Sequence, residues 1–557
     1  MSSVVPARPS PANTRQSSQS AQGNSLTWLQ LLVVLVAGCV HAVSMAWPFA
    51  WGALLGLNPG QPVGWLQLVA MALLAGQLGG ARTWQRGAWL GGLFAVAMQC
   101  ATYWWLFISL HVYGGLAAPL TVLAVVLLAA LLGLYYATAS AIFVRIAPVH
   151  TGLRAVFFAA MWLLAELARV KFFTGFPWGE GGYAHVDGWA RPLAGWIGVH
   201  GLTFMAAMVA AWLAFCLLAP KTRWLPALVG MAVCAAVAWL PVVDADLAEP
   251  DPALVKPMSV TLLQGNIPQD EKFVPGTGIA TALRWYDEQL RNARTALVVA
   301  PETALPMLPQ QLPEGYWLAL QLRFATGGQA ALIGLPLGDF ATGDYSNSVI
   351  GLKPVHADLP APLVLPEPYR YDKHHLVPFG EVIPLGFHWF IRLMNIPLGD
   401  FNRGAVGQPS FNWQGQRLAP NICYEDLFGE ELAARFVDPV RAPTIFVNVS
   451  NIAWFGNTVA IDQHLQISRM RALEFGRPMI RATNTGATAI IDHRGEVTHF
   501  LPRHTRGALI GEVQGRSRIT PYAWWSGRFG LWPLWGLGLA ALSLALVFRR
   551  QDRLAAA

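Results

Sequence analysis

Charged residues are scarce in this chain of 557 residues. Asp, Glu, Lys and Arg together make up 12% of the sequence, whereas hydrophobic residues make up 54%. A soluble domain typically carries about 25% charged residues. This deficit excludes a protein whose whole surface is solvated, so we expect much of the chain to face lipid. The length is sufficient for two domains.

A dense basic stripe is also missing. Lys and Arg number 38 against 31 Asp and Glu, which gives a net charge of +7, and the cationic residues lie largely in short segments between apolar runs. That distribution is typical of membrane topology and not of a nucleic-acid-binding face. We therefore expect a lipid bilayer as a partner, and no nucleic acid.

Cysteine is rare as well, with five residues in the chain. Four of them lie in apolar stretches and are expected to be small buried hydrophobic side chains: Cys39, Cys100, Cys216 and Cys234. Cys423 stands alone in the long polar region. Because it has no local partner for a disulfide, we expect it to be a free thiol.

Long apolar runs are abundant, and about 20 apolar residues are enough to span a bilayer. Eight runs fit, at residues 27–46, 62–80, 87–110, 116–144, 153–173, 194–219, 224–242 and 530–548. We predict seven transmembrane helices within residues 26–245 and an eighth within 528–549. The first run lacks a small-residue cleavage site, so it is predicted to be an anchor and not a signal peptide. Residues 1–25 are expected to be a disordered tail.

Basic residues in the short loops orient these helices. Arg82 and Arg86 lie between the second and third runs, and Arg549 and Arg550 follow the last run. The positive-inside rule then places both termini, including a tail at 550–557, in the cytoplasm, and the segment between the last two runs outside. Three basic residues fall on the outer side, where they are either snorkelling anchors or contacts to phospholipid head groups: Arg169, Lys171 and Arg191.

Residues 257–515 have a different character. They contain short β-rich runs at 259–267, 296–299, 331–335, 418–423, 444–449 and 480–491, with amphipathic helical stretches at 280–294 and 462–475. Strands that alternate with helices indicate a layered α/β domain. The runs 487–491 and 497–500 flank Asp-His-Arg-Gly and predict a hairpin.

Three segments of this region carry candidate chemistry. Glu302 follows an apolar strand, Lys373 lies in a mixed polar and aromatic loop, and Cys423 ends a strand just before Glu425 and Asp426. A nucleophilic thiol requires a base to take its proton and a cation to stabilise the developing charge. Glu302 and Lys373 supply one of each. From the residues alone, an inert buried Cys with exposed charged neighbours is the alternative.

A metal site is considered because His374 and His375 are adjacent. No third ligand lies at a recognisable spacing, so we expect no metal. Nothing in the sequence calls for a cofactor.

The three segments resemble the nitrilase, or carbon–nitrogen hydrolase, superfamily, whose Glu–Lys–Cys triad lies on separate strand ends. Five segments resemble the apolipoprotein N-acyltransferase family in particular: 174–178 (Thr-Gly-Phe-Pro-Trp), 264–269 (Gln-Gly-Asn-Ile-Pro-Gln), 373–381, 453–456 (Ala-Trp-Phe-Gly) with Gln463-His464, and 469–486. Where that family often has Lys-Trp, this chain has Lys272-Phe273. The resemblance implies about eight transmembrane helices and a nitrilase-like αββα sandwich at 257–515 that faces the periplasm from the bacterial inner membrane.

The resemblance also implies a two-step acyl transfer. Glu302 would act as the base for Cys423, which attacks the sn-1 ester of a phospholipid, while Lys373 stabilises the oxyanion. The thioester on Cys423 is then attacked by the N-terminal amine of a diacylated apolipoprotein. Glu381 would hold Lys373, and Glu425 would line the site, unless each is an ordinary exposed carboxylate. Tyr424 either supports the site or is packing.

The segment 385–394 is apolar and aromatic within an otherwise polar region. We expect a mobile arm that dips into the bilayer and gates lipid entry, with buried core as the alternative. Its predicted lipid contacts, together with those of the Ala-Trp-Phe-Gly segment, are Phe387, Trp389, Phe390, Trp454 and Phe455. Nothing requires more than a monomer. The rival functions are a membrane-bound amidase or nitrilase and a transporter or scaffold with an inactive domain.

Overall fold

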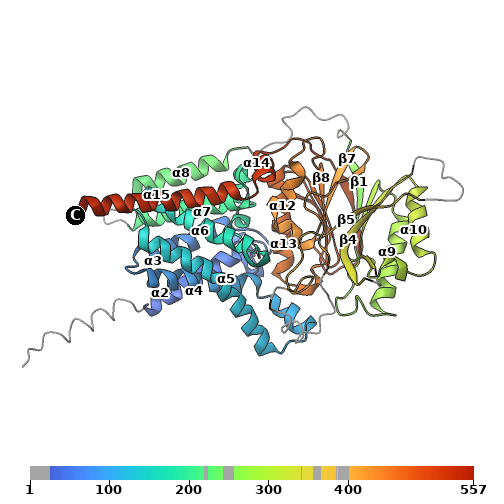
Figure 1. The fold of residues 1–557 in the computed structure, drawn as a ribbon, viewed down its shortest axis with the longest axis horizontal. Helices are drawn as coiled ribbons and strands as arrows, with labels where there is room; N and C mark the ends of the chain where they lie inside the picture. The colour runs from blue at the N-terminus through green and yellow to red at the C-terminus, as the bar shows by residue number, and fades with distance from the viewer. Residues whose placement is uncertain are drawn as a thin grey trace, which may run out of the picture.

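The computed structural model describes residues 26–218, 224–241, 256–339, 342–355, 365–383, 386 and 401–556. A bundle of long helices and a layered domain of strands and helices lie side by side (Figure 1). The bundle is formed by the helices before residue 241 and by the last helix of the chain, which returns to it after the layered domain (Figure 1).

Every predicted apolar run contains a helix. The helices are α2 (Trp28–Val43), α3 (Gly64–Gly79), α4 (Trp84–Tyr103), α5 (Ala118–Ile146), α6 (Thr151–Lys171), α7 (Ala194–Leu217), α8 (Trp224–Ala238) and α15 (Trp532–Ala556). Three helical segments are long and apolar enough to cross a membrane by length and composition: Ala118–Ile146, Arg191–Leu217 and Trp532–Gln551. Three shorter helices are apolar as well: Trp28–Val43, Gly64–Gly79 and Leu225–Ala238.

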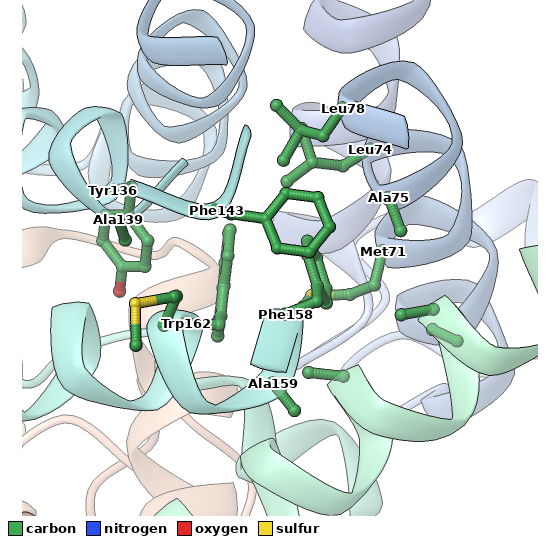
Figure 2. Packing of buried hydrophobic residues seen from close by; sticks show 14 of the residues in the cluster. Met71, Leu74, Ala75, Leu78, Tyr136, Ala139, Phe143, Phe158, Ala159 and Trp162 are labelled. Carbon is green, nitrogen blue, oxygen red and sulfur yellow. The ribbon is translucent and has the colours of Figure 1, made fainter. Parts of the chain in front are cut away.

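The inside of the bundle is packed with aromatic and aliphatic side chains. Figure 2 shows Phe143, Phe158 and Trp162 beside Met71 and Leu74, all of them buried. Large apolar side chains also cover the outside, and on α5 they include Leu120, Leu123, Leu127 and Leu131. An extended exposed apolar surface of this kind is typical of a lipid-facing helix and not of a solvated one.

The layered domain contains two six-stranded sheets. The first has the order β12 (Gly507–Val513), β1 (Met258–Gln264), β2 (Leu297–Ala300), β3 (Ala330–Asp339), β4 (Asp344–Leu352) and β5 (Tyr369–Asp372). The second has the order β11 (Val497–Phe500), β10 (Ala489–Ile491), β9 (Met479–Thr483), β8 (Ile445–Ser450), β7 (Gln416–Ile422) and β6 (Phe411–Trp413). Val260 and Val299 of the first sheet share one buried core with Val447 of the second, so the sheets pack face to face.

Helices cover both outer faces of the sandwich. α9 (Gly278–Asn292) and α10 (Tyr316–Ala325) lie on the first sheet, away from the bundle (Figure 1). α12 (Gly429–Ala433) and α13 (Val459–Phe475) lie on the second sheet, between it and the bundle (Figure 1). The arrangement confirms the predicted αββα sandwich.

One predicted strand differs. The run at 480–491 is two antiparallel strands, β9 and β10, because the chain reverses between Thr483 and Ala489. The predicted hairpin after it is confirmed: Asp492 and Glu496 are joined by a backbone hydrogen bond of 2.9 Å, and β10 pairs with β11.

The helix α13 joins the two halves of the molecule. Gln463 on this helix accepts hydrogen bonds from the indole N–H groups of Trp105 (3.0 Å) and Trp178 (2.8 Å), and donates to the Thr102 carbonyl (3.0 Å). The Val199 N–H of α7 donates to the Glu474 carboxylate at 2.6 Å. These buried contacts fix the sandwich on the bundle.

The two interpretations of the outer basic residues are wrong for Arg169, whereas for Arg191 and Lys171 they stay predictions. Arg169 is buried and donates to the Trp178 carbonyl at 2.9 Å. Arg191 forms an ion pair with Glu496 of the sandwich at 2.5 Å. The Arg169 side chain is therefore enclosed by the protein, whereas the Arg191 side chain is partly exposed. Lys171, at the end of α6, is exposed.

Candidate active site

The three predicted chemical groups come from three strand ends. Glu302 lies two residues beyond β2, Lys373 directly follows β5, and Cys423 directly follows β7. Lys373 Nζ lies 3.4 Å from Glu302 Oε1, and both side chains are buried. The charges of both act on the Cys423 thiol. The sandwich thus brings groups from its two sheets into one site.

The backbone at Cys423 is unusual. Its φ is 53°, in the left-handed region that non-glycine residues rarely adopt. The Asn448 side chain donates to the Cys423 carbonyl at 3.3 Å, and His464 Nε2 lies at the same distance from that oxygen. A strained residue held in this way at a strand end is typical of a functional position.

Glu302 is surrounded by donors. Its Oε1 accepts from the Asn347 amide at 2.8 Å, and its Oε2 accepts from the Asn451 backbone N–H at 2.8 Å. Burial opposes ionisation, but the Lys373 ammonium and the Asn347 amide hold the pKa of Glu302 below its ordinary value. Glu302 is therefore a carboxylate and can accept a proton.

Lys373 is held by two carboxylates. Its Nζ lies 2.8 Å from Glu381 Oε2, closer than to Glu302. Burial favours the neutral amine, but the two carboxylates raise the pKa of Lys373 above its ordinary value. Asn347 also donates to Glu381 at 2.7 Å and so bridges the two carboxylates. Lys373 is thus a fixed cation in the site.

The Cys423 group rests as a thiol. Burial, followed by the Glu302 charge, raises the pKa of Cys423 to about 12, and Lys373 opposes this rise. A thiol of this kind becomes nucleophilic only when a neighbouring base takes its proton during attack. Of the carboxylates whose charge acts on Cys423, Glu302 has the larger effect and is the candidate for this base.

Glu425 is buried and not an exposed carboxylate. It accepts hydrogen bonds from the backbone N–H groups of Ile422 (2.7 Å) and His374 (2.6 Å), and from the Tyr371 hydroxyl (2.7 Å). Burial raises the pKa of Glu425 above its ordinary value, although these donors oppose the rise. Glu425 therefore ties the segment before Cys423 to the segment after Lys373.

Tyr424 links the nucleophile to the helical bundle. Its hydroxyl donates to the Gly175 carbonyl at 3.1 Å, and its ring is stacked with that of Phe176. His375 Nε2 lies 3.0 Å from the Thr174 carbonyl in the same loop. The Thr-Gly-Phe-Pro-Trp segment of the bundle thus contacts residues beside both Cys423 and Lys373.

Comparisons with known proteins identify the family to which each half of the chain is similar. Residues 47–212 match the family described as Apolipoprotein N-acyltransferase N-terminal domain, and residues 259–522 match Carbon-nitrogen hydrolase. The chain is 58% identical to an apolipoprotein N-acyltransferase of Verminephrobacter eiseniae over 529 residues, which cover 91% of this chain and 94% of that protein. This chain belongs to the apolipoprotein N-acyltransferase family.

A second member of the apolipoprotein N-acyltransferase family, from Ralstonia nicotianae, is 43% identical over 557 residues, covering 97% of this chain and 98% of that protein. Among solved structures, an amidase from Nesterenkonia sp. has 17% identity and a TM-score of 0.34, covering 48% of this chain and 92% of that chain. The family relationship thus extends over both halves of the chain.

The predicted lipid contacts of this family member are only partly described. Phe455 packs against Trp105 with ring centroids 4.2 Å apart, and Trp454 meets Tyr113 edge-on at 5.7 Å. Both aromatic side chains therefore lie where the sandwich contacts the bundle. Phe387, Trp389 and Phe390 of the predicted arm lie outside the described residues.

The adjacent histidines are both engaged in hydrogen bonds. His374 Nδ1 lies 2.7 Å from the Gly404 carbonyl, and His375 Nδ1 lies 3.0 Å from Glu431. Among the described residues, one buried group has spacing compatible with a metal, with ligand atoms within 4.8 Å of one another: Glu166, Glu180 and His200. This group does not include Glu302, Lys373 or Cys423. The expectation that the protein needs no metal stays a prediction.

Sequence reasoning missed two polar residues of the site. Asn347 lies inside β4, where nothing in the local pattern marks it, and it contacts both Glu302 and Glu381. Lys272 lies three residues beyond the Gln-Gly-Asn-Ile-Pro-Gln segment, and the Lys272-Phe273 pair alone does not predict a place in the site. The Lys272 Nζ donates to the Glu302 carbonyl at 3.1 Å and is buried.

Proposed function

We propose that this chain transfers the sn-1 acyl chain of a phospholipid to the N-terminal amine of a diacylated apolipoprotein, the last step of lipoprotein maturation. The observation that carries the proposal is the group formed by the buried Glu302 and Lys373 with the partly buried Cys423, held against an apolar helical bundle through Tyr424 and Gly175. Both substrates are anchored in lipid, and a site in contact with a membrane bundle suits them. The reaction itself is inferred from the relatives, which are named apolipoprotein N-acyltransferase.

The first half-reaction acylates the enzyme. Glu302 takes the Cys423 proton as Sγ attacks the ester carbonyl, and the oxyanion that forms is stabilised by the Lys373 ammonium. Preorganised charge at this position is typically the largest catalytic contribution. When the C–O bond breaks, Glu302 returns the proton to the leaving oxygen, so a lysophospholipid departs and a thioester remains.

The second half-reaction transfers the chain. The acceptor amine attacks the thioester carbonyl, the C–N bond forms, and the C–S bond breaks. Glu302 accepts a proton from the nitrogen and returns it to Cys423. Kinetics should be ping-pong. Glu381 positions Lys373, and Glu425 and Tyr424 position the loops that carry the reacting groups.

The proposal includes the membrane arrangement. The eight helices of the bundle cross the bacterial inner membrane, residues 1–25 and 550–557 lie in the cytoplasm, and the sandwich at 257–515 faces the periplasm. The aromatic residues Phe387, Trp389 and Phe390, together with Trp454 and Phe455, contact the lipid chains that enter the site. The protein acts as a monomer, without metal or cofactor.

An isotope-tracing experiment tests this function. The purified protein in mixed micelles is given phosphatidylethanolamine labelled only in its sn-1 chain, together with a synthetic diacylated lipopeptide. We expect the labelled chain on the lipopeptide amine, and none with Cys423→Ser. Release of the labelled fatty acid to water at the same rate with and without lipopeptide would instead establish a hydrolase. The absence of both products would refute acyl chemistry at this site.

A further inference from the structure

A second lysine lies beside the general base. Lys272 belongs to the turn that follows β1, and its Nζ donates to the Glu302 backbone carbonyl at 3.1 Å. The turn is fixed on the site: its Gln269 accepts from the Asn451 side chain at 2.8 Å, and the Asn451 backbone N–H donates to Glu302 Oε2. Lys272 is 2% exposed, although it is long and charged.

The two lysines around Glu302 have opposite environments. Lys373 contacts two carboxylates, Glu302 and Glu381. Among the described residues, the hydrogen-bond acceptor of Lys272 Nζ is a neutral carbonyl, and no carboxylate lies in ion-pairing range of it. A buried ammonium without a paired carboxylate is costly, so such a lysine readily gives up its proton.

The acceptor amine must lose a proton before it can attack, and a neutral lysine could accept that proton. An α-amine has a reference pKa near 8, so at neutral pH most of it is an ammonium that cannot attack a thioester. Two protons must therefore leave the nitrogen. Glu302 accounts for one, which it passes to Cys423. A second acceptor within the site would remove the other without waiting for the minor neutral fraction of the amine in solution.

We propose that Lys272 is the base that deprotonates the ammonium of the acceptor lipoprotein before it attacks the thioester; this inference rests on the proposed function. The Lys272 amine takes one proton from the incoming ammonium and becomes an ammonium itself. The neutral nitrogen then attacks the carbonyl carbon, and its second proton goes through Glu302 to Cys423 Sγ. Lys272 afterwards releases its proton to water, which restores the neutral amine for the next turnover.

The electrostatics support the assignment. Burial lowers the pKa of Lys272 to about 8, although Glu302, followed by Cys423, opposes the shift. These are the titratable groups that act on Lys272, with Lys373 beyond Glu302. A base whose pKa lies near the working pH is the most effective one. The next two residues, Phe273 and Val274, are 39% and 44% exposed, so the turn presents apolar surface beside the buried amine.

The test separates the two half-reactions. Wild type, Lys272→Met, Lys272→Arg and the exposed control Lys353→Met are first acylated with phospholipid, and the Cys423 thioester is followed by mass spectrometry. The thioester is then chased either with diacylated lipopeptide, between pH 6 and 9, or with hydroxylamine, which is largely neutral at pH 7.

We expect thioester formation within about twofold of wild type in all variants. The lipopeptide chase at pH 7 should slow by about 10²-fold in both Lys272 variants, as for loss of a general base, and the deficit should shrink toward pH 9. The hydroxylamine chase should be unchanged. Arginine is the decisive variant, because it keeps the charge and cannot be deprotonated.

Three outcomes would overturn the inference. A normal lipopeptide chase in Lys272→Arg would mean that only the positive charge matters. Equal slowing of acylation and of both chases would mean that Lys272 acts through Glu302, and a chase defect in Lys353→Met would mean that the effect is not local. If the wild-type protein forms no thioester, the proposed function is refuted, and the role of Lys272 that rests on it is refuted as well.

Discussion

Glu381 offers a sharp perturbation of the site, because its carboxylate pairs directly with Lys373, whereas its charge is a minor influence on Cys423. In Glu381→Gln the shape is preserved, but Lys373 loses the closer of its two carboxylates, at 2.8 Å, and keeps Glu302 at 3.4 Å. We expect Lys373 to move onto Glu302, which weakens the base and displaces the oxyanion donor. Loss of one such donor slows chemistry by about 10²–10³-fold, or roughly 3–4 kcal/mol.

The same change should destabilise the fold. Breaking a buried ion pair costs about 3–5 kcal/mol, and we expect the lower end because Glu302 remains beside the ammonium. The assay is single-turnover acylation of Cys423, together with the apparent melting temperature in detergent. The exposed Glu367→Gln is the matched control and should change neither quantity. Wild-type acylation by Glu381→Gln would refute the role given to this carboxylate.

Three further predictions concern pH, the interface and metals. Because the pKa of Glu302 is held below its ordinary value, acylation of Cys423 should persist as the pH falls to the ordinary range of a glutamic acid and decline only below it. A decline centred near pH 6 would contradict this. Gln463→Leu leaves two indole N–H groups without their acceptor, which costs about 1–3 kcal/mol of stability for each group. Arg191→Ala breaks a partly exposed ion pair worth only about 0–1 kcal/mol. The melting temperature of Gln463→Leu should therefore lie well below that of Arg191→Ala. Prolonged chelation should leave acyl transfer unchanged, and loss of activity restored by a divalent cation would show that a metal is needed.

The sequence predicts much of the fold because its strongest signals are local. Apolar runs of membrane length locate the helices of the bundle, and hydrophobic β-rich runs locate the central strands β1, β2, β3, β7 and β8. The strands that escaped prediction are at the sheet margins or are polar, such as β4 with its Ser-Asn-Ser and β12 with its exposed Ile510. β4 pairs with its chain neighbour β3, but its polar residues interrupt the hydrophobic pattern. β12 pairs with β1, which is distant in sequence, so no local pattern reveals that pairing.

The site also combines residues that the local sequence marks with residues that only folding brings there. Glu302, Lys373 and Cys423 end strands and carry recognisable chemistry, so short segments identify them. Asn347 and Lys272 matter because folding brings them to Glu302 from other parts of the chain. The burial of Arg169 could not be predicted from the sequence either. Its position near the end of an apolar run suggests an interfacial anchor, whereas the structure encloses its guanidinium within the protein.

The central claim is that Cys423 carries the acyl chain between the two lipid substrates. Peptide mass spectrometry of the protein after incubation with phospholipid alone tests it directly, with Cys423→Ser as the control. We expect a hydroxylamine-sensitive acyl adduct on the Cys423 peptide that disappears when diacylated lipopeptide is added, at the rate at which the triacylated product appears. Product formation without any adduct on Cys423, or an adduct that lipopeptide does not remove, would contradict it.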